Sequence, residues 1–253
     1  MKTYKTSEIA HIIGIHPNTV RLYEELQLIP KPERRPNGYR VYTDLHLQQF
    51  RLARTALKVE VLQNGLRKKA VEIIKTSAKC DFDRALLLAE EYLEQIENEK
   101  QNAEEAISIT NRLLLNNGQK EDGKYFGRKE AAEYLQVTMD TLRNWEMNGL
   151  LTVKRKKNGY RVYTQEDISR LKIIRSLRCA NYSLSAILRM LNSLSRNPEA
   201  DVREALETPK ETEDIVSVCD KLLTSLNNAG ENARGMLAQL KKMKKKFQTN
   251  PLL

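Results

Sequence analysis

The sequence contains no long hydrophobic run. No stretch approaches the ~18 consecutive apolar residues that a membrane-spanning helix needs. Its first residues lead directly into a helical pattern, without the apolar core of a secretory signal. Only 6% of the residues are aromatic, but 40% are hydrophobic and these fall in regular patterns. We therefore expect a folded, helix-rich, cytoplasmic protein with no membrane partner.

Cysteine and histidine are scarce, with three residues of each. Cys80, Cys179 and Cys219 are widely separated and form no CxxC pair, so their spacing predicts free thiols and no metal finger. None of the histidines lies near a plausible nucleophile or metal cluster in the sequence. We therefore expect no enzyme, no metal site and no cofactor.

Excess positive charge is present, and it lies in two separate segments. Residues 1–58 carry ten Lys and Arg against five Asp and Glu, a net charge of +5. Residues 124–181 carry thirteen against six, a net charge of +7. The rest of the chain carries twenty against twenty-two, a net charge of −2. Surplus charge often serves only solubility, but its confinement to these segments favours a polyanionic partner.

The two basic segments are copies of each other. The heptapeptide Asn-Gly-Tyr-Arg-Val-Tyr-Thr occurs at residues 37–43 and again at 158–164, 121 positions later. Upstream, Thr-Val-Arg-Leu-Tyr-Glu at residues 19–24 matches Thr-Leu-Arg-Asn-Trp-Glu at 141–146, an offset of 122. Seven consecutive identities are very improbable by chance, so the sequence predicts a duplicated module.

Each copy predicts the same order of elements. In the first, a short helix over residues 6–13 is followed, after a glycine turn, by a helix over residues 17–26. The Asn-Gly pair of residues 37–38 is a strong signal for a hairpin turn, and a third helix follows from about Asp44. The equivalent elements of the second copy are a helix over residues 129–135, a helix over 139–147 and a wing turn over 154–159. This order predicts a winged helix-turn-helix.

Three shared motifs give the copies a family resemblance. Thr-x-Arg-x-Tyr/Trp-Glu in the second helix, the Leu-Ile or Leu-Leu pair after it, and Gly-Tyr-Arg-x-Tyr in the wing resemble the DNA-binding domain of the MerR family of bacterial regulators. The resemblance covers most of residues 4–58 and 125–191. It implies double-stranded DNA as the partner, and a regulator that acts with RNA polymerase at a promoter. Residues 58–74 have no clear match to the family's next helix pair, so their fold is left open.

We expect the second helix of each copy to enter the major groove and each wing to contact the DNA backbone. Short polar residues at the helix start and an arginine one turn later are suited to base or phosphate contact. The candidate DNA-binding residues are Asn18, Thr19, Arg21, Tyr23, Arg34, Arg35, Arg40 and Tyr42 in the first copy, and Thr141, Arg143, Trp145, Lys154, Arg155, Lys156, Lys157, Arg161 and Tyr163 in the second.

Many of these residues have a structural alternative. The polar residues at the helix start could instead cap it, and capping is the favoured interpretation of Asp140, because a carboxylate repels phosphate. Arg21 could form a surface ion pair with Glu24 or Glu25. Trp145 is more often a packing residue, whereas the resemblance favours phosphate contact for Tyr23. The two wing tyrosines could pack on the helix, and the basic wing residues could simply be solvated.

A long heptad pattern follows each module. Apolar residues at alternating spacings of three and four predict a helix that packs on a partner helix. The alternative, that each helix packs only on its own module, does not explain a pattern of about thirty residues. The expected coiled-coil positions include Leu86, Leu93, Ile96, Ile107 and Leu114 in the first helix, and Ile215, Leu222, Leu226, Met236 and Leu240 in the second.

We therefore predict a mainly α fold of two winged helix-turn-helix modules, each followed by a long coiled-coil helix. The expected segments are the first module (1–84), the first long helix and linker (85–123), the second module (124–211), and the second long helix and tail (212–253). MerR-type regulators dimerise through such helices in an antiparallel coiled coil. Our hypothesis is that this chain pairs its own two helices as a pseudo-dimer, with the Glu-rich half of the first against the Lys-rich end of the second.

The predicted function is sequence-specific binding of promoter DNA by a transcription regulator, which by resemblance acts by distorting the promoter. A monomeric pseudo-dimer could read an asymmetric operator, because its recognition helices differ. A homodimer with four modules is the alternative architecture. An architectural, excisionase-like DNA-binding protein, or a coiled-coil interaction protein with vestigial basic modules, are the alternative functions.

Overall fold

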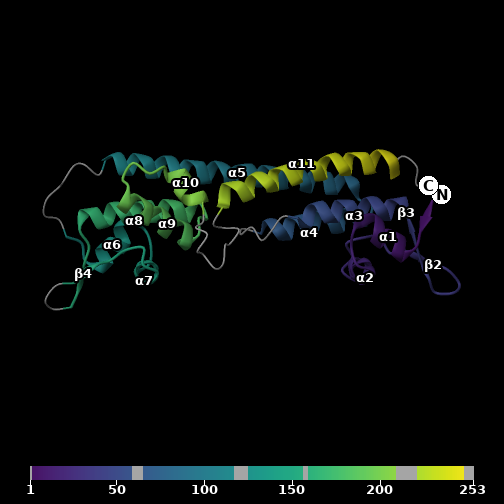
Figure 1. Ribbon diagram of the computed structural model, residues 1–253, viewed down its shortest axis with the longest axis horizontal. Coiled ribbons are helices and arrows are strands. Elements are labelled where there is room, and N and C mark those ends of the chain that lie inside the picture. Colours follow the sequence, from purple (N-terminus) through teal and green to yellow (C-terminus); the bar gives the residue numbers. More distant parts are fainter. Residues whose placement is uncertain (1, 59–64, 117–124, 156–158, 209–220, 248–253) are drawn as a thin grey trace. The chain divides into compact units, whose positions relative to one another are not determined.

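The computed structural model describes residues 2–58, 65–116, 125–155, 159–208 and 221–247. These residues form a mainly helical fold with short antiparallel strands, as predicted (Figure 1). The chain divides into two compact units, of which unit 1 comprises Met1–Asn98 with Ser225–Leu253 and unit 2 comprises Glu99–Thr224. Among the described helices, none combines the length and the apolar character that crossing a membrane requires.

The first module is a winged helix-turn-helix in unit 1. Its elements are β1 (Thr3–Tyr4), α1 (Thr6–Ile13), α2 (Pro17–Glu25), β2 (Glu33–Arg34), β3 (Arg40–Thr43), α3 (Asp44–Leu57) and α4 (Leu66–Ala78). The strands form an antiparallel sheet in the order β1-β3-β2, so the wing is a hairpin of β2 and β3. Gly14 has a φ of 70° between α1 and α2, a left-handed conformation that glycine adopts at no steric cost. The predicted helices and hairpin are confirmed.

The segment that the sequence left open contains α4, which packs on α3. A buried glutamine joins the two helices: Gln49 Nε2 donates to the carbonyl oxygens of Leu28 (3.1 Å) and Ile74 (2.8 Å). Its Oε1 accepts a hydrogen bond from the Ser77 hydroxyl at 2.9 Å. A buried amide that satisfies three partners in this way fixes the position of α4 relative to the end of the recognition helix.

The second module repeats the same architecture in unit 2. Its elements are α6 (Arg128–Tyr134), α7 (Met139–Met147), β4 (Lys154–Arg155), β5 (Arg161–Val162), α8 (Gln165–Cys179), α9 (Leu184–Arg196) and α10 (Val202–Glu207). Strands β4 and β5 pair antiparallel, with Lys154 opposite Val162. Helix α9 follows α8 as α4 follows α3, so both copies contain the helix pair that sequence comparison found only in the second.

Two long helices complete the fold, α5 (Phe82–Asn116) and α11 (Leu222–Phe247). Within unit 1 they run antiparallel, as predicted, because Arg234 contacts Glu97 (Nη1 to Oε1, 3.0 Å) while Lys244, further along α11, pairs with Asp83, nearer the start of α5 (Figure 1). The expected opposition of a Glu-rich half to a Lys-rich end is realised only in part. Glu91, one of the expected acidic partners, instead pairs with Lys69 of α4 at 3.2 Å.

The predicted heptad positions that the structure describes are buried in α11, but only some of those in α5 are buried. Leu222, Leu226, Met236 and Leu240 are all buried, and Ile215 lies outside the described residues. In α5, Ile96 and Ile107 are buried, but Leu86, Leu93 and Leu114 are only half-buried. The fully buried positions near its start include Phe82, Ala85 and Tyr92, together with Ala89, which has the heptad spacing between Leu86 and Leu93. Near its start α5 contacts α4 as well as α11, through the ion pairs of Glu91 with Lys69 and of Asp83 with Lys244.

The long helix of the second copy packs on the first module. Gln239 of α11 donates through Nε2 to the backbone oxygen and the side-chain oxygen of Gln48 in α3, at 3.1 and 3.2 Å. Lys246 pairs with Asp44 at the first turn of α3. Three polar contacts in unit 1 thus join elements that come from different copies of the repeat.

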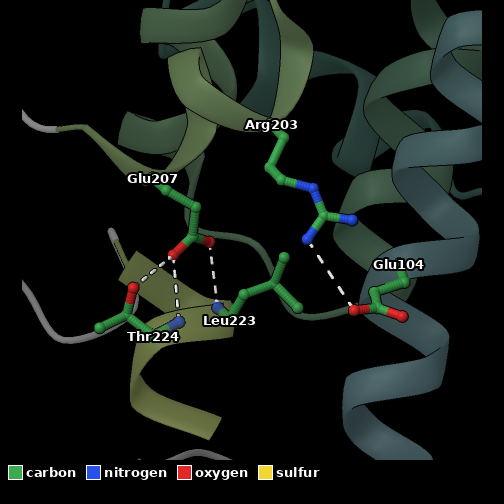
Figure 2. Close-up of polar contacts among 5 residues, drawn as sticks. All are labelled: Glu104, Arg203, Glu207, Leu223 and Thr224. Atoms are coloured by element: carbon green, nitrogen blue, oxygen red, sulfur yellow. Dashed lines mark hydrogen bonds and ion pairs between the residues drawn. The ribbon is translucent and has the colours of Figure 1, made fainter. Parts of the chain in front are cut away.

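The long helix of the first copy packs on the second module within unit 2. Glu99 of α5 accepts a hydrogen bond from Asn181 Nδ2 at 3.0 Å, and Glu104 lies 3.8 Å from Arg203 of α10. Glu207, at the end of α10, accepts hydrogen bonds from the N–H groups of Leu223 (3.0 Å) and Thr224 (3.2 Å) in the first turn of α11 (Figure 2). Helix α10 therefore links α5 to the start of α11.

Candidate nucleic-acid interface

The recognition helices α2 and α7 are held by buried aromatic residues. Tyr23 is 5% exposed and stacks on Phe50 of α3 with ring centroids 5.4 Å apart. Trp145, at the matching position of α7, is 4% exposed. Both side chains therefore pack each helix on its module. Packing was the favoured interpretation of Trp145, but the phosphate contact expected for Tyr23 from the family resemblance does not agree with this burial.

The caps of the recognition helices differ from the residues suggested by sequence. His16 caps α2, because its Nδ1 accepts from the N–H of Asn18 at 3.2 Å. Thr138 caps α7 and accepts from the N–H of Thr141 at 3.0 Å. The capping role favoured for Asp140 is therefore wrong, since the cap position lies two residues earlier and Asp140 is exposed.

Helix α2 presents four exposed side chains on one face: Asn18, Arg21, Leu22 and Glu25. Their spacing of three and four residues is that of one helical surface. Arg21 Nη1 donates to Asn18 Oδ1 at 3.2 Å. The alternative prediction was an ion pair between Arg21 and Glu24 or Glu25. Glu24 instead pairs with Arg40 of the wing. Thr19 is half-buried beside this face.

Helix α7 presents the matching face of the second module. Asp140, Arg143, Asn144 and Met147 are exposed and have the same spacing. Thr141 is half-buried, and its hydroxyl lies 2.8 Å from the Thr138 hydroxyl. The two candidate groove arginines, Arg21 and Arg143, therefore occupy equivalent exposed positions.

A wing arginine is tied to the recognition helix in both modules. Arg40 Nε donates to Glu24 Oε2 at 2.5 Å, and Arg161 Nε donates to Glu146 Oε2 at 2.6 Å. These hydrogen bonds raise the pKa of both guanidinium groups. Since the contact uses only Nε, the Nη groups remain as donors for a phosphate. Sequence reasoning named the arginines but missed their glutamates, although Glu24 and Glu146 recur at matching positions of the repeat.

The wing tyrosines have the opposite orientation to the one expected for DNA contact. Tyr42 and Tyr163 are 0% and 1% exposed, so they belong to the core, and burial raises the pKa of both phenols. The packing alternative is therefore correct for this pair. Tyr39 and Tyr160 are each 72% exposed next to the wing turn. The sequence analysis did not name Tyr39 and Tyr160 as candidates, although a tyrosine precedes the wing arginine in both copies. Side chains alternate along a strand, so this tyrosine points to the face opposite that of Arg40 or Arg161.

The remaining basic wing residues surround this surface. Arg34, Arg35, Lys154 and Arg155 are exposed, and Lys156 and Lys157 lie outside the described residues. In the first module, a cleft of about 680 Å³ lies between the start of α1, the recognition helix and the wing, and its lining includes Arg21, Arg35, Arg40 and Tyr39. An open cleft with three guanidinium groups suits a phosphate backbone.

Other chemistry is sparse in the parts of the chain that the structure describes. Within those residues, no group of His, Cys, Asp and Glu side chains is placed to hold a metal ion. Cys80 and Cys179 are free cysteines, as their spacing predicted, and Cys219 lies outside the described residues.

Both modules are similar in sequence to known families of regulatory proteins. Residues 128–194 match a family described as MerR HTH family regulatory protein, and residues 5–42 match the MerR family regulatory protein model. The chain is 32% identical over 110 residues to the HTH-type transcriptional regulator CueR of Escherichia coli O6:H1, which is 43% of this chain and 76% of that protein. It is 29% identical over 99 residues to the mercuric resistance operon regulatory protein of Bacillus cereus, which is 38% of this chain and 75% of that protein. The regulator ZntR of Escherichia coli K12 is 38% identical over 71 residues, which is 28% of this chain and 50% of ZntR. No solved structure is significantly similar to the chain.

Proposed function

The chain belongs to the MerR family of DNA-binding transcription regulators, and we propose that one chain supplies both DNA-binding modules of the functional regulator. In this proposal the two long helices pair within the chain as a pseudo-dimer. Each module inserts its recognition helix, α2 or α7, into a major groove of the same promoter duplex.

The exchange of long helices between the two copies carries this proposal. In unit 1, α11 from the second copy hydrogen-bonds to α3 of the first through Gln239 and Gln48. In unit 2, α5 from the first copy contacts the second module through Glu99 and Asn181. Contacts in which each copy supplies a helix to the other are those of a two-fold dimer, with both halves in one chain.

The interface residues support binding of duplex DNA by both modules. Each recognition helix presents an exposed arginine, Arg21 or Arg143, and each wing presents an arginine that retains donors for a phosphate. The excess positive charge of the chain lies in residues 1–58 and 124–181, which belong to these two modules. Both modules present a recognition-helix arginine and a wing arginine among the described residues, so neither is expected to be vestigial.

We also propose that the protein distorts the promoter and acts together with RNA polymerase, as the family resemblance implies. A protein that holds a duplex at two grooves can impose a bend or a change of twist on the segment between them. We expect energy transfer between dyes at the two ends of the bound duplex to differ from that of the unbound duplex.

Solution mass with and without DNA tests the pseudo-dimer. The duplex would be about 40 base pairs long, enough for two major-groove segments, and selected for binding from random sequence. We expect a protein particle of one chain, 29.2 kDa, and a complex of one chain with one duplex. Arg21→Ala and Arg143→Ala should each weaken that complex by about 1–3 kcal/mol without changing its stoichiometry.

A particle of two chains that persists at low concentration would show that the long helices pair between chains. The single-chain proposal would then be replaced by a homodimer with four modules. If both arginine variants bind as tightly as the parent, the assignment of α2 and α7 to the groove is wrong.

A further inference from the structure

We propose that the two recognition helices read different bases, so that the operator is asymmetric and the chain binds it in a single orientation. This inference rests on the proposed function, in which both modules bind one duplex. A two-fold symmetric operator mirrors a protein with two identical recognition surfaces. The outward faces of α2 and α7 are not identical.

The repeat offset of 122 residues aligns the two exposed faces position by position. The aligned pairs are Asn18 with Asp140, Arg21 with Arg143, Leu22 with Asn144, and Glu25 with Met147. Only the arginine is shared. The buried residues of the same helices are more alike, since Val20 aligns with Leu142 and Tyr23 with Trp145. The modules have therefore kept the packing of the helix and changed the surface that faces DNA.

Helix α2 offers donors and an apolar contact. Because Asn18 Oδ1 accepts a hydrogen bond from Arg21, the amide offers a base edge chiefly its N–H donors. Leu22 is 45% exposed on a face that is otherwise polar. An apolar side chain at such a position suits the methyl group of thymine. The first half-site should therefore contain a thymine opposite Leu22 and a base with an acceptor, such as guanine, opposite Asn18.

Helix α7 offers an acceptor where α2 offers a donor. Thr138 caps the helix, so the Asp140 carboxylate is not used for capping and is exposed at the helix start. A carboxylate accepts only, and it pairs with the exocyclic amino group of cytosine. Asn144 replaces the apolar Leu22 with an amide, whose Oδ1 has a long 3.4 Å contact with Asn148 Nδ2 and keeps a lone pair for the amino group of adenine. The second half-site should therefore contain cytosine and adenine at the two positions where the first contains an acceptor base and thymine.

Selection of binding sites from a library of random duplexes tests this inference. For the parent protein, we expect two dissimilar half-sites that share the base contacted by the arginine. At the positions contacted by residues 22 and 144, exchanging thymine and adenine should weaken binding by about 5- to 150-fold.

Exchange of the exposed faces provides the matched variants. Asn18→Asp, Leu22→Asn and Glu25→Met together give α2 the face of α7, and this variant should select an inverted repeat of the second half-site. Asp140→Asn, Asn144→Leu and Met147→Glu give the reciprocal face, and should select an inverted repeat of the first half-site. All six positions are exposed, so the melting temperatures should stay close to that of the parent.

Each outcome bears on the inference. Dissimilar half-sites for the parent and inverted repeats for the two variants support it. An inverted repeat for the parent, or an unchanged site for both variants, overturns it while leaving DNA binding by both modules intact. A parent protein that enriches no sequence overturns the proposed function, and the inference with it.

Discussion

We predict that Arg40 of the wing and Glu24 of the recognition helix make opposite contributions to DNA binding. Arg40 Nε donates to the Glu24 carboxylate, and the two side chains are 23% and 13% exposed. In the proposed complex, Arg40→Ala would remove a phosphate contact and leave a carboxylate near the DNA without its main partner. Arg34 Nη2 lies 3.8 Å from Glu24 Oε1, but the Arg34 side chain is 50% exposed and neutralises the carboxylate only in part.

The size of the effect follows from two terms. A lost phosphate contact costs about 1 kcal/mol and lowers the slope of log affinity against log salt by about 0.9. A carboxylate about 7 Å from a phosphate, at an effective dielectric constant of about 40, adds about 1 kcal/mol of repulsion. Arg40→Ala should therefore weaken binding by about 2 kcal/mol, roughly 30-fold. Glu24→Gln in the same chain should recover about half of this free energy, because the amide keeps the shape and removes the charge.

Fluorescence anisotropy titrations of a labelled duplex, at several salt concentrations, measure both quantities. Arg161→Ala with and without Glu146→Gln gives the matched pair in the second module, where the Nε to Oε2 distance is 2.6 Å. Thermal melting of each variant separates loss of binding from loss of folding. If Glu24→Gln weakens binding further in the Arg40→Ala background, Glu24 does not repel the DNA, because the glutamate would then contribute a favourable contact of its own.

Two further predictions concern the first module. Gln49→Leu removes three buried hydrogen bonds at nearly constant volume, so the free energy of unfolding in urea should fall by about 2–4 kcal/mol. The control Arg51→Leu, at an exposed position, should lower it by less than about 0.5 kcal/mol. Equal effects of the two substitutions would show that Gln49 does not hold α4 in place. His46 accepts from the N–H of Thr43 at 3.0 Å and burial lowers its pKa, so below about pH 6.5 the unfolded chain takes up a proton that the folded chain does not. The free energy of unfolding should therefore fall as pH falls below about 6.5 and not depend on this group above it. His46→Asn should reduce that dependence, whereas His11→Asn, at an exposed position, should not; identical pH profiles for all three proteins would contradict the assignment.

The repeat made most of the fold predictable. Two copies of one pattern predicted the recognition helices to within a residue at each end, because proline or a polar cap begins each helix and the wing motif follows at a spacing that differs by one residue between the copies. Helix α4 was not predicted, because its apolar residues match no shared motif and its position depends on the long-range bonds of Gln49 to Leu28 and Ile74. The burial pattern at the start of α5 was also not predicted in full, since Leu86 and Leu93 have heptad spacing and are only half-buried.

The candidate site was predictable in residue type and less so in orientation. The arginines of helix and wing are at the expected surface, since both repeat at matching positions. The tyrosines were assigned to the wrong member of each pair, because Tyr39 and Tyr42 are equally apolar and only the packing of Tyr42 between Phe50 and His46 decides which is buried. Helix caps were also misplaced by two residues, since sequence alone does not show which polar residue precedes the first helical turn.

The exchange of long helices between the copies also bears on how such a regulator responds to its own abundance. When a regulator is assembled from two chains and most chains are unpaired, the concentration of the active dimer is proportional to the square of the chain concentration. In the single-chain arrangement, the contacts of Gln239 with Gln48 and of Asn181 with Glu99 form as part of folding and do not depend on a second molecule. The number of active regulators then rises in direct proportion to the number of chains made, and subunit exchange with related regulators in the same cell cannot produce mixed dimers.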